Sequence, residues 1–202
     1  MRVSFAKTLL FAASIAIATP TPVLALADDP ARATVQKLDD GLIGIMKAHG
    51  SEASRAAQIA PVIERSFDLP LMTRLAVGPS WNTIAPAEQQ ALLAAFRRLI
   101  VAQYAANFNG WAGETFATGA QVEARGTDRL VRTTLNVPGK DAVAISYRLR
   151  ESDGRWQIID IFYRNAISQI ALRRSDFAAV LAKGGAKALT AHLDILSAKG
   201  NF

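Results

Sequence analysis

Side chains that could perform chemistry are few in this chain of 202 residues. The chain has no cysteine, which excludes disulfides, thiolate metal sites and cysteine nucleophiles. Its two histidines, His49 and His192, have no cysteine, histidine or carboxylate at ligand spacing, so we expect both to be solvated. Motifs for a serine nucleophile, a zinc peptidase or a phosphate-binding loop do not occur. The sequence therefore predicts that the protein is not an enzyme and uses no metal or cofactor.

Two carboxylates are the remaining candidates for acid–base chemistry. Ser175-Asp176 resembles a catalytic pair, but a Ser-Asp dipeptide directly before Phe177 is more typical of a helix cap. Asp160 is the one carboxylate within an apolar strand pattern. We expect a hydrogen-bonded or edge-facing structural role for Asp160, because catalysis would require a partner and a perturbed pKa.

The first 27 residues have the pattern of a secretory signal peptide. Arg2 and Lys7 form a basic start, an apolar run follows at 8–18, and Ala25-Leu26-Ala27 offers small residues for cleavage. The apolar run is too short to span about 30 Å of hydrocarbon, although a membrane anchor is the alternative. We therefore predict an exported protein whose mature chain, residues 28–202, forms a single domain.

Positive charge is moderate and lies partly around the predicted sheet. A formal net charge of +6 and export together argue against nucleic-acid binding, which favours concentrated charge. Six arginines either form the solvated face of a sheet or a positive rim for anionic headgroups or an acidic partner. They are Arg148, Arg150, Arg155, Arg164, Arg173 and Arg174.

Apolar residues at helical spacing dominate residues 28–110. The pattern predicts helices at 30–48 and 51–64, a short helix between Asp68 and Gly78, and a long helix that begins at Pro86. Arg97 and Arg98 lie off the apolar stripe of the long helix. That stripe consists of Leu92, Phe96, Leu99, Ile100, Tyr104 and Phe108.

Alternating apolar and polar residues follow in 111–165. They predict antiparallel strands at 121–125, 130–137, 142–150 and 156–163, with hairpin turns at 138–141 and 152–154. Residues 166–202 are again helical in pattern, with a pause at Gly184-Gly185. This order predicts an α+β fold with about four strands and an N-terminal all-helical part.

The order and spacing of several motifs resemble one known family. Over about residues 30–195 the chain is similar to the MlaC, or toluene-tolerance, family of periplasmic lipid-binding proteins. Residues 159–193 look more like HpnM, the branch associated with hopanoids. One departure is Ala85, where the family usually has Thr or Ser before the proline. The motifs are Phe67-Asp68-Leu69-Pro70-Leu71-Met72, Gly78-Pro79-Ser80-Trp81, Ala85-Pro86-Ala87-Glu88-Gln89-Gln90, Phe96-Arg97-Arg98-Leu99, Tyr147-Arg148-Leu149-Arg150 and Asp153-Gly154-Arg155-Trp156-Gln157-Ile158-Ile159-Asp160.

The resemblance implies an NTF2-like curved antiparallel sheet wrapped by helices, with an apolar cavity between them. It implies a periplasmic carrier that moves a phospholipid or hopanoid between the inner and outer membranes. Its expected partners are an inner-membrane ABC-type transporter complex and an outer-membrane lipoprotein/porin complex, which it contacts transiently as a monomer. An NTF2-like enzyme that acts on a lipid or isoprenoid intermediate through Asp160 is the alternative, and a non-binding adaptor is a third.

The apolar stripes then supply candidates for the cavity wall, because an exposed CH₂ group costs about 0.8 kcal/mol in water. We expect Tyr147, Tyr163 and Arg164 at the mouth, where each offers a hydrogen-bond donor. Every candidate could equally be ordinary core. The set is Phe67, Leu71, Leu75, Phe96, Ile100, Tyr104, Val131, Leu135, Ile145, Tyr147, Ile158, Phe162, Tyr163, Arg164, Ile167 and Ile170.

Overall fold

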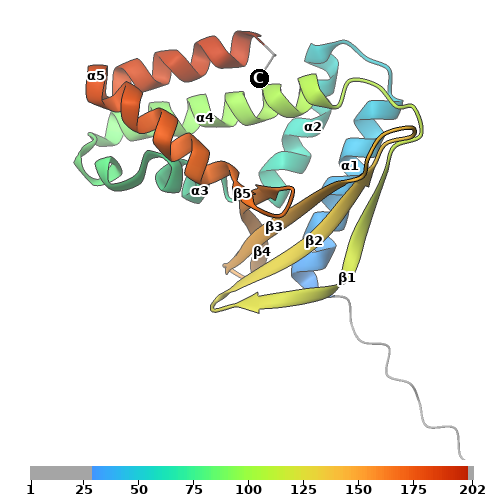
Figure 1. Cartoon of the computed structure of the whole chain (residues 1–202). Coiled ribbons are helices and arrows are strands. Elements are labelled where there is room, and N and C mark those ends of the chain that lie inside the picture. Colours follow the sequence, from blue (N-terminus) through green and yellow to red (C-terminus); the bar gives the residue numbers. More distant parts are fainter. Residues whose placement is uncertain (1–28, 200–202) are drawn as a thin grey trace, which may run out of the picture.

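A computed structural model describes residues 29–199 (Figure 1). The predicted signal peptide, residues 1–27, lies outside this range. Within the described residues no helix is both long and apolar enough to cross a membrane. The elements are α1 (Pro30–Lys47), α2 (Glu52–Ser66), α3 (Leu69–Val77), a 3₁₀ helix (Gly78–Thr83), α4 (Pro86–Asn107), β1 (Thr115–Arg125), β2 (Asp128–Asn136), β3 (Val143–Ser152), β4 (Arg155–Tyr163), β5 (Ile167–Ser168) and α5 (Gln169–Lys199).

The helices begin where the sequence offers caps, with one exception. The side chains of Asp29, Ser51 and Asp68 each accept a hydrogen bond from a backbone N–H of the helix that follows. Ala85 occupies the corresponding position before α4 and provides no side-chain bond. The long helix α4 therefore starts with its first-turn N–H groups uncapped by a side chain.

The sheet is a meander in which every strand pairs with the next in antiparallel order, β1-β2-β3-β4-β5. Asp153 (φ 51°) and Gly154 (φ 73°) form a tight turn between β3 and β4, as two-residue hairpins require. The predicted α+β class and antiparallel sheet are confirmed, with the two-residue strand β5 as an addition. β1 begins at Thr115, well before the predicted residue 121.

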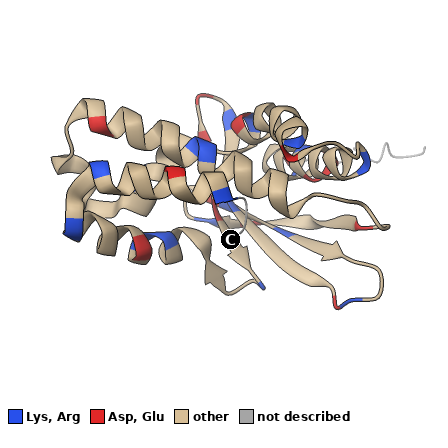
Figure 2. Ribbon diagram, turned by 90° about the horizontal axis from the view of Figure 1, so that it is seen from above, with Lys and Arg blue, Asp and Glu red and all other residues tan. Residues whose placement is uncertain are grey.

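Helices lie on one side of this curved sheet (Figures 1 and 2). α1 runs along the face of β1, β2 and β4, while α4 packs between α2, α3 and α5. The corner between α2 and α3 is fixed to the sheet, because the Asp68 N–H donates to the Ile158 carbonyl at 3.0 Å. The core therefore lies between the inner face of the sheet, which is the face toward α1, and the helices.

Two bulges interrupt the strand register. On β1, Thr118 pairs with Thr133 and Val122 with Val131, so residues 119–121 stand opposite one residue of β2. On β4, Asp160 pairs with Arg148 and Ile158 with Leu149, which leaves Ile159 without a partner in the ladder. On β4 the one extra residue reverses the side-chain alternation, so residues on either side of that bulge change faces. On β1 there are two extra residues, so Thr118 and Val122 stay on the same face.

The start of α5 corrects one prediction. Ser175-Asp176 does not cap a helix, because both residues lie inside α5. The cap is formed upstream, where the Ala171 N–H donates to Ser168 Oγ at 3.0 Å. The predicted pause at Gly184-Gly185 is confirmed as a break in α5, where Gly185 has φ 65°.

Candidate functional site

The inner face of the sheet is apolar and packs against four aromatic rings, which we call the aromatic line. Phe67 at the end of α2 meets Tyr104 of α4 edge-on at 5.7 Å between ring centroids. Tyr104 stacks on Phe108 at 5.7 Å, and Phe108 meets Phe116 of β1 at 6.3 Å. The aromatic line therefore runs through the molecule from α2 to β1, across the C-terminal half of α4.

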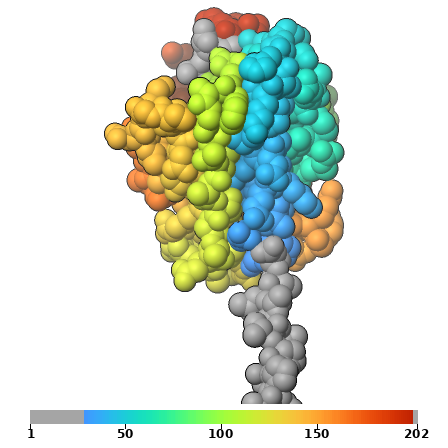
Figure 3. All heavy atoms as spheres, turned by 90° about the vertical axis from the view of Figure 1, so that its right-hand side faces the viewer, coloured from blue at the N-terminus to red at the C-terminus, as the bar shows by residue number. Residues whose placement is uncertain are grey.

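One end of the aromatic line opens into a pocket of about 590 Å³ between α1 and β1, the α1–β1 pocket. These two elements lie side by side in Figure 3. Phe116 and Asp39 line it, and Lys47 at its rim holds its Nζ 4.6 Å above the Trp111 ring. The remaining lining residues are Ala33, Gln36, Lys37, Asp40, Ile43, Glu114, Thr115 and Thr118.

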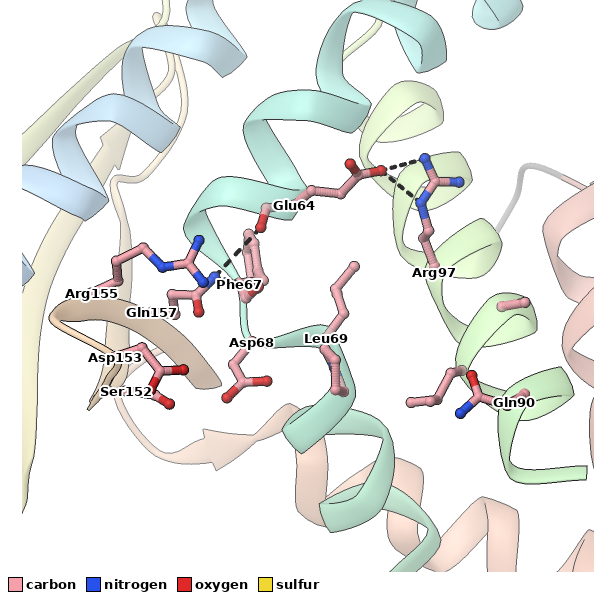
Figure 4. A pocket seen from close by; sticks show the side chains of 13 residues that line it. Glu64, Phe67, Asp68, Leu69, Gln90, Arg97, Ser152, Asp153, Arg155 and Gln157 are labelled. Carbon is pink, nitrogen blue, oxygen red and sulfur yellow. Dashed lines mark hydrogen bonds and ion pairs between the residues drawn. The ribbon is translucent and has the colours of Figure 1, made fainter. Parts of the chain in front are cut away.

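The other end of the aromatic line reaches a second pocket, of about 540 Å³, which we call the Phe67 pocket. Figure 4 shows Phe67 between Glu64 of α2, Gln157 of β4 and the residues of α3. Arg97 Nε donates to Glu64 Oε1 at 2.6 Å, and Gln157 Nε2 donates to the Phe67 carbonyl at 3.2 Å. Both pockets have volumes typical of small-ligand sites, about 300–1,000 Å³.

A polar cluster of Asp39, Thr118 and Thr133 lies between α1 and the inner face of the sheet. Thr118 Oγ1 donates to Asp39 Oδ2 at 2.7 Å. The other carboxyl oxygen, Asp39 Oδ1, and the Thr133 hydroxyl are buried and have no hydrogen-bond partner in the described part of the chain. Asp39 is 4 % exposed and Thr133 is 2 % exposed. Such groups are strongly disfavoured in an interior unless a partner is supplied.

Burial sets the protonation of this cluster. It raises the pKa of Asp39 from 3.8 to about 7, against the lowering effect of the Thr118 hydrogen bond. Burial, with a further contribution from the Asp39 charge, also raises the pKa of the Tyr104 and Tyr147 phenols. Within residues 29–199 the buried side-chain oxygens with unused hydrogen-bonding capacity are thus Asp39 Oδ1 and Thr133 Oγ1.

The structure brings most of the predicted wall residues together. Seven belong to the buried core between sheet and helices, and Leu75, Tyr104 and Ile145 pack against it. Tyr147, expected at the mouth, is 2 % exposed and lies inside. The seven core members are Phe67, Phe96, Ile100, Val131, Tyr147, Ile158 and Ile170.

The other six predicted residues lie elsewhere. Leu71 and Leu135 are half-buried outside that core, although Leu135 is the cross-strand partner of Phe116 at the end of the aromatic line. Phe162 is on the opposite face of the sheet, because the β4 bulge places it with Arg132 and Arg148 around a separate outer pocket. Tyr163, Arg164 and Ile167 are exposed at the turn between β4 and β5, where Arg164 lies 5.7 Å from the Tyr163 ring.

Sequence reasoning missed Asp39, Thr118, Phe108 and Phe116 as members of the site. Phe108 was on the predicted stripe of α4 and Phe116 lay before the predicted start of β1. Asp39 carried a usable signal, because it falls on the helical face that also contains Val35 and Leu42. A carboxylate on the apolar face of a helix is a candidate functional group.

Asp160 has a structural role in the hydrogen-bond pattern. Its carboxylate accepts from Ser168 Oγ at 2.6 Å and from the Ile170 N–H at 3.1 Å, so it holds the first turn of α5 against β4. Residues 29–199 contain no cluster of three or more metal-ligating side chains.

The predicted arginine rim is divided among different surroundings. Arg148 Nε and Arg150 Nε donate to the buried Asp128 carboxylate at 2.6 and 2.7 Å. Burial by itself raises the pKa of Asp128, but these hydrogen bonds outweigh it and hold the pKa below its usual value. Arg173 Nη2 donates to Gln103 Oε1 at 2.5 Å. Charged residues are likewise scattered over the ribbon in Figure 2.

Comparison with known proteins identifies the relatives of this fold. A solved structure of a phospholipid-binding protein from Ralstonia solanacearum, in complex with a phospholipid, superposes with a TM-score of 0.75 at 27 % sequence identity. The match covers 85 % of this chain and 99 % of that chain. A comparison with curated protein sequences found no match. The model of the MlaC protein family matches residues 36–194. This chain therefore belongs to the MlaC family.

Proposed function

We propose that the protein is a periplasmic lipid carrier that shuttles a phospholipid or hopanoid between the inner and outer membranes. It does so as the soluble component of an ABC-type transport system, between an inner-membrane transporter complex and an outer-membrane lipoprotein/porin complex. The observation that carries this proposal is the similarity to a phospholipid-binding protein over 99 % of that protein's chain. The secretory pattern of residues 1–27 supports the periplasmic location.

The acyl chains lie along the aromatic line in this proposal. The line connects two pockets, so a tail that enters at the α1–β1 pocket can extend toward Phe67 by displacing rings that contact each other edge-on or by stacking. Transfer from water of a chain of about sixteen carbons is worth on the order of 12 kcal/mol. Burial of the tail therefore supplies the affinity without any catalytic group. Lys37 and Lys47 lie at the rim of the same pocket, where a lipid phosphate can pair with them.

Native mass spectrometry of protein purified from the periplasm tests the proposal. The expected result is a mass increase of one lipid, which is lost on organic extraction and regained when vesicles of labelled phospholipid are added. Lipid extraction then identifies the cargo as a glycerophospholipid or a hopanoid. A protein that is isolated without lipid and takes up none from vesicles contradicts the carrier proposal.

A further inference from the structure

The polar cluster is an unusual component of a site for hydrocarbon chains. The described part of the chain has two buried side-chain oxygens without a partner, and both belong to this cluster. Thr118 connects them, because it hydrogen-bonds Asp39 and is the cross-strand partner of Thr133. Side chains of such a pair have Cβ atoms about 4.5–5.5 Å apart. Asp39 and Thr133 are therefore both neighbours of Thr118.

The β1 bulge begins beside the polar cluster. β1 loses its register directly after Thr118, and residues 119–121 bulge away from the ladder. Asp39 and Thr118 line the α1–β1 pocket, whereas Thr133, the cross-strand partner of Thr118, is not part of its lining. Bulges are common where a strand re-aims a side chain next to a functional site. Asp39 Oδ1 and Thr133 Oγ1 are both buried, so a ligand that enters there reaches them only when α1 or β1 shifts.

The hydrogen-bonding capacity of Asp39 and Thr133 determines which chemical group of a ligand the cluster can bind. Asp39 Oδ1 needs a donor whenever the carboxyl is ionised, and the Thr133 hydroxyl has a proton to donate. A ligand hydroxyl satisfies both at once, since it donates to Asp39 and accepts from Thr133. An ester carbonyl accepts only, so it would leave an ionised Asp39 Oδ1 without a partner.

We propose that the polar cluster binds a hydroxyl group on the apolar part of the cargo, so that the protein prefers a lipid with a hydroxylated hydrocarbon body over its unsubstituted counterpart. This inference rests on the proposed carrier function and adds the substrate class to it. The Tyr104 and Tyr147 hydroxyls provide further donors around the same interior. They extend the range of hydroxyl positions that can be accommodated.

Binding titrations of the wild type and of variants test the preference for hydroxylated lipids. The purified, delipidated protein is titrated with stearic acid and with a set of hydroxystearic acids that differ in the position of the hydroxyl. We expect at least one hydroxylated acid to bind about tenfold more tightly than stearic acid, the size of one hydrogen bond to a buried charged group. Thr133→Val, which keeps the side-chain shape, and Asp39→Leu should each bring the ratio of the affinities for the hydroxylated acid and for stearic acid close to one.

Thr134→Val is the matched control, because Thr134 lies next to Thr133 on β2 and faces the other side of the sheet. It should keep the full preference. If Asp39→Leu does not fold, Thr133→Val and Asp39→Asn carry the test, and Asp39→Asn should retain part of the preference through its amide.

Three outcomes overturn the inference. The first is equal affinity for stearic acid and every hydroxystearic acid. The second is a loss in Thr133→Val that affects both kinds of lipid equally. The third is a lipid-loaded crystal structure in which water alone bridges Asp39 and Thr133. A protein that binds neither fatty acids nor phospholipid would instead contradict the carrier function itself, so the two failures are distinguishable.

Discussion

Asp39 makes the stability of the protein depend on pH. Its carboxyl has a pKa of about 7 in the folded protein, against the ordinary value of 3.8 for an exposed side chain. Between these values the folded state holds a proton that the unfolded state has lost, so stability decreases as pH rises from about 4 to about 7 and is level above that. We expect the free energy of unfolding of the lipid-free protein to fall by about 2–3 kcal/mol from about pH 5 to about pH 8 because of this group.

Urea denaturation at several pH values measures this effect. Asp39→Asn should remove that decrease, since the amide has no charged form to bury, and should be more stable than the wild type at about pH 8. Asp141→Asn, at an exposed carboxylate in the turn before β3, should leave the pH profile unchanged. A wild-type profile that is parallel to that of Asp39→Asn would show that Asp39 is solvated in the folded protein.

Single substitutions by glutamate at three apolar positions distinguish the packed core from the lipid site. Ile158 and Leu92 are both 0 % exposed. Ile158→Glu and Leu92→Glu should therefore each lower the free energy of unfolding by several kcal/mol, and neither variant should accumulate as folded protein. Leu135 is half-buried opposite Phe116 at the end of the aromatic line, where water can reach a new carboxylate. Leu135→Glu should therefore fold but bind lipid weakly.

The readouts for these variants are circular dichroism and lipid uptake from labelled vesicles. Asn136→Glu is the control for Leu135→Glu, because Asn136 is exposed on the other face of β2. It should fold and bind lipid normally. Folded, lipid-binding Leu135→Glu protein would exclude this end of the sheet from the site.

Single residues were predictable where one pattern governs them. Phe67, Phe96 and Val131 lie in the core because apolar periodicity places them there. Phe162 could not be placed in this way, because its face depends on the unpaired Ile159 upstream. The polar cluster could not be predicted either, since Thr118 and Thr133 meet Asp39 only through cross-strand pairing and the packing of α1.

The first turn of α4 lacks the side-chain cap that stabilises the starts of α1, α2 and α3. Ala85 has the extended conformation of an N-cap residue, and its carbonyl already accepts from the Gln89 N–H at 2.9 Å, but it has no side-chain oxygen. We expect Ala85→Ser to raise the free energy of unfolding by about 1 kcal/mol. For a chain of this size the melting temperature should rise by about 2–4 °C.

Thermal unfolding measures the change, and Ala91→Ser provides the matched control. Ala91 is exposed within α4, where serine lowers helix propensity, so this variant should be no more stable than the wild type. Equal effects of the two substitutions would show that the first turn of α4 is already satisfied by solvent.

Helices and strands whose apolar repeat runs without interruption were predictable from the sequence. β1 shows why an element with an interrupted repeat was predicted only in part. The helices α1 and α4 agree with their apolar stripes. In β1 the alternation of Phe116 and Thr118 is broken by the bulge and restarts at Val122, so the pattern alone indicates only the second part of the strand. A bulge is stabilised by contacts across the sheet and with α1, which local sequence does not specify.

At the scale of the whole molecule, the aromatic line decides whether the interior is a fixed core or a site that a lipid tail can occupy. The two end rings of this line, Phe67 and Phe116, line the two pockets, whereas Phe96 lines neither and packs edge-on against Phe177 in the core. In the carrier proposal, a void along the line is therefore open to the lipid site. An enclosed apolar void forfeits packing contacts that nothing restores. A void that opens into a lipid site can instead be filled by the tail.

Tyr104→Ala and Phe96→Ala should therefore respond differently to lipid. Both variants should be less stable than the wild type when delipidated, Phe96→Ala by about 3–5 kcal/mol. Saturation with phospholipid should bring the melting temperature of Tyr104→Ala close to that of the loaded wild type, because the tail replaces the lost ring and binding to the folded state adds stability. Phe96→Ala should keep its full deficit relative to the loaded wild type. Differential scanning calorimetry of loaded and delipidated protein measures both effects, and an equal deficit of the two loaded variants would place the tails away from Tyr104.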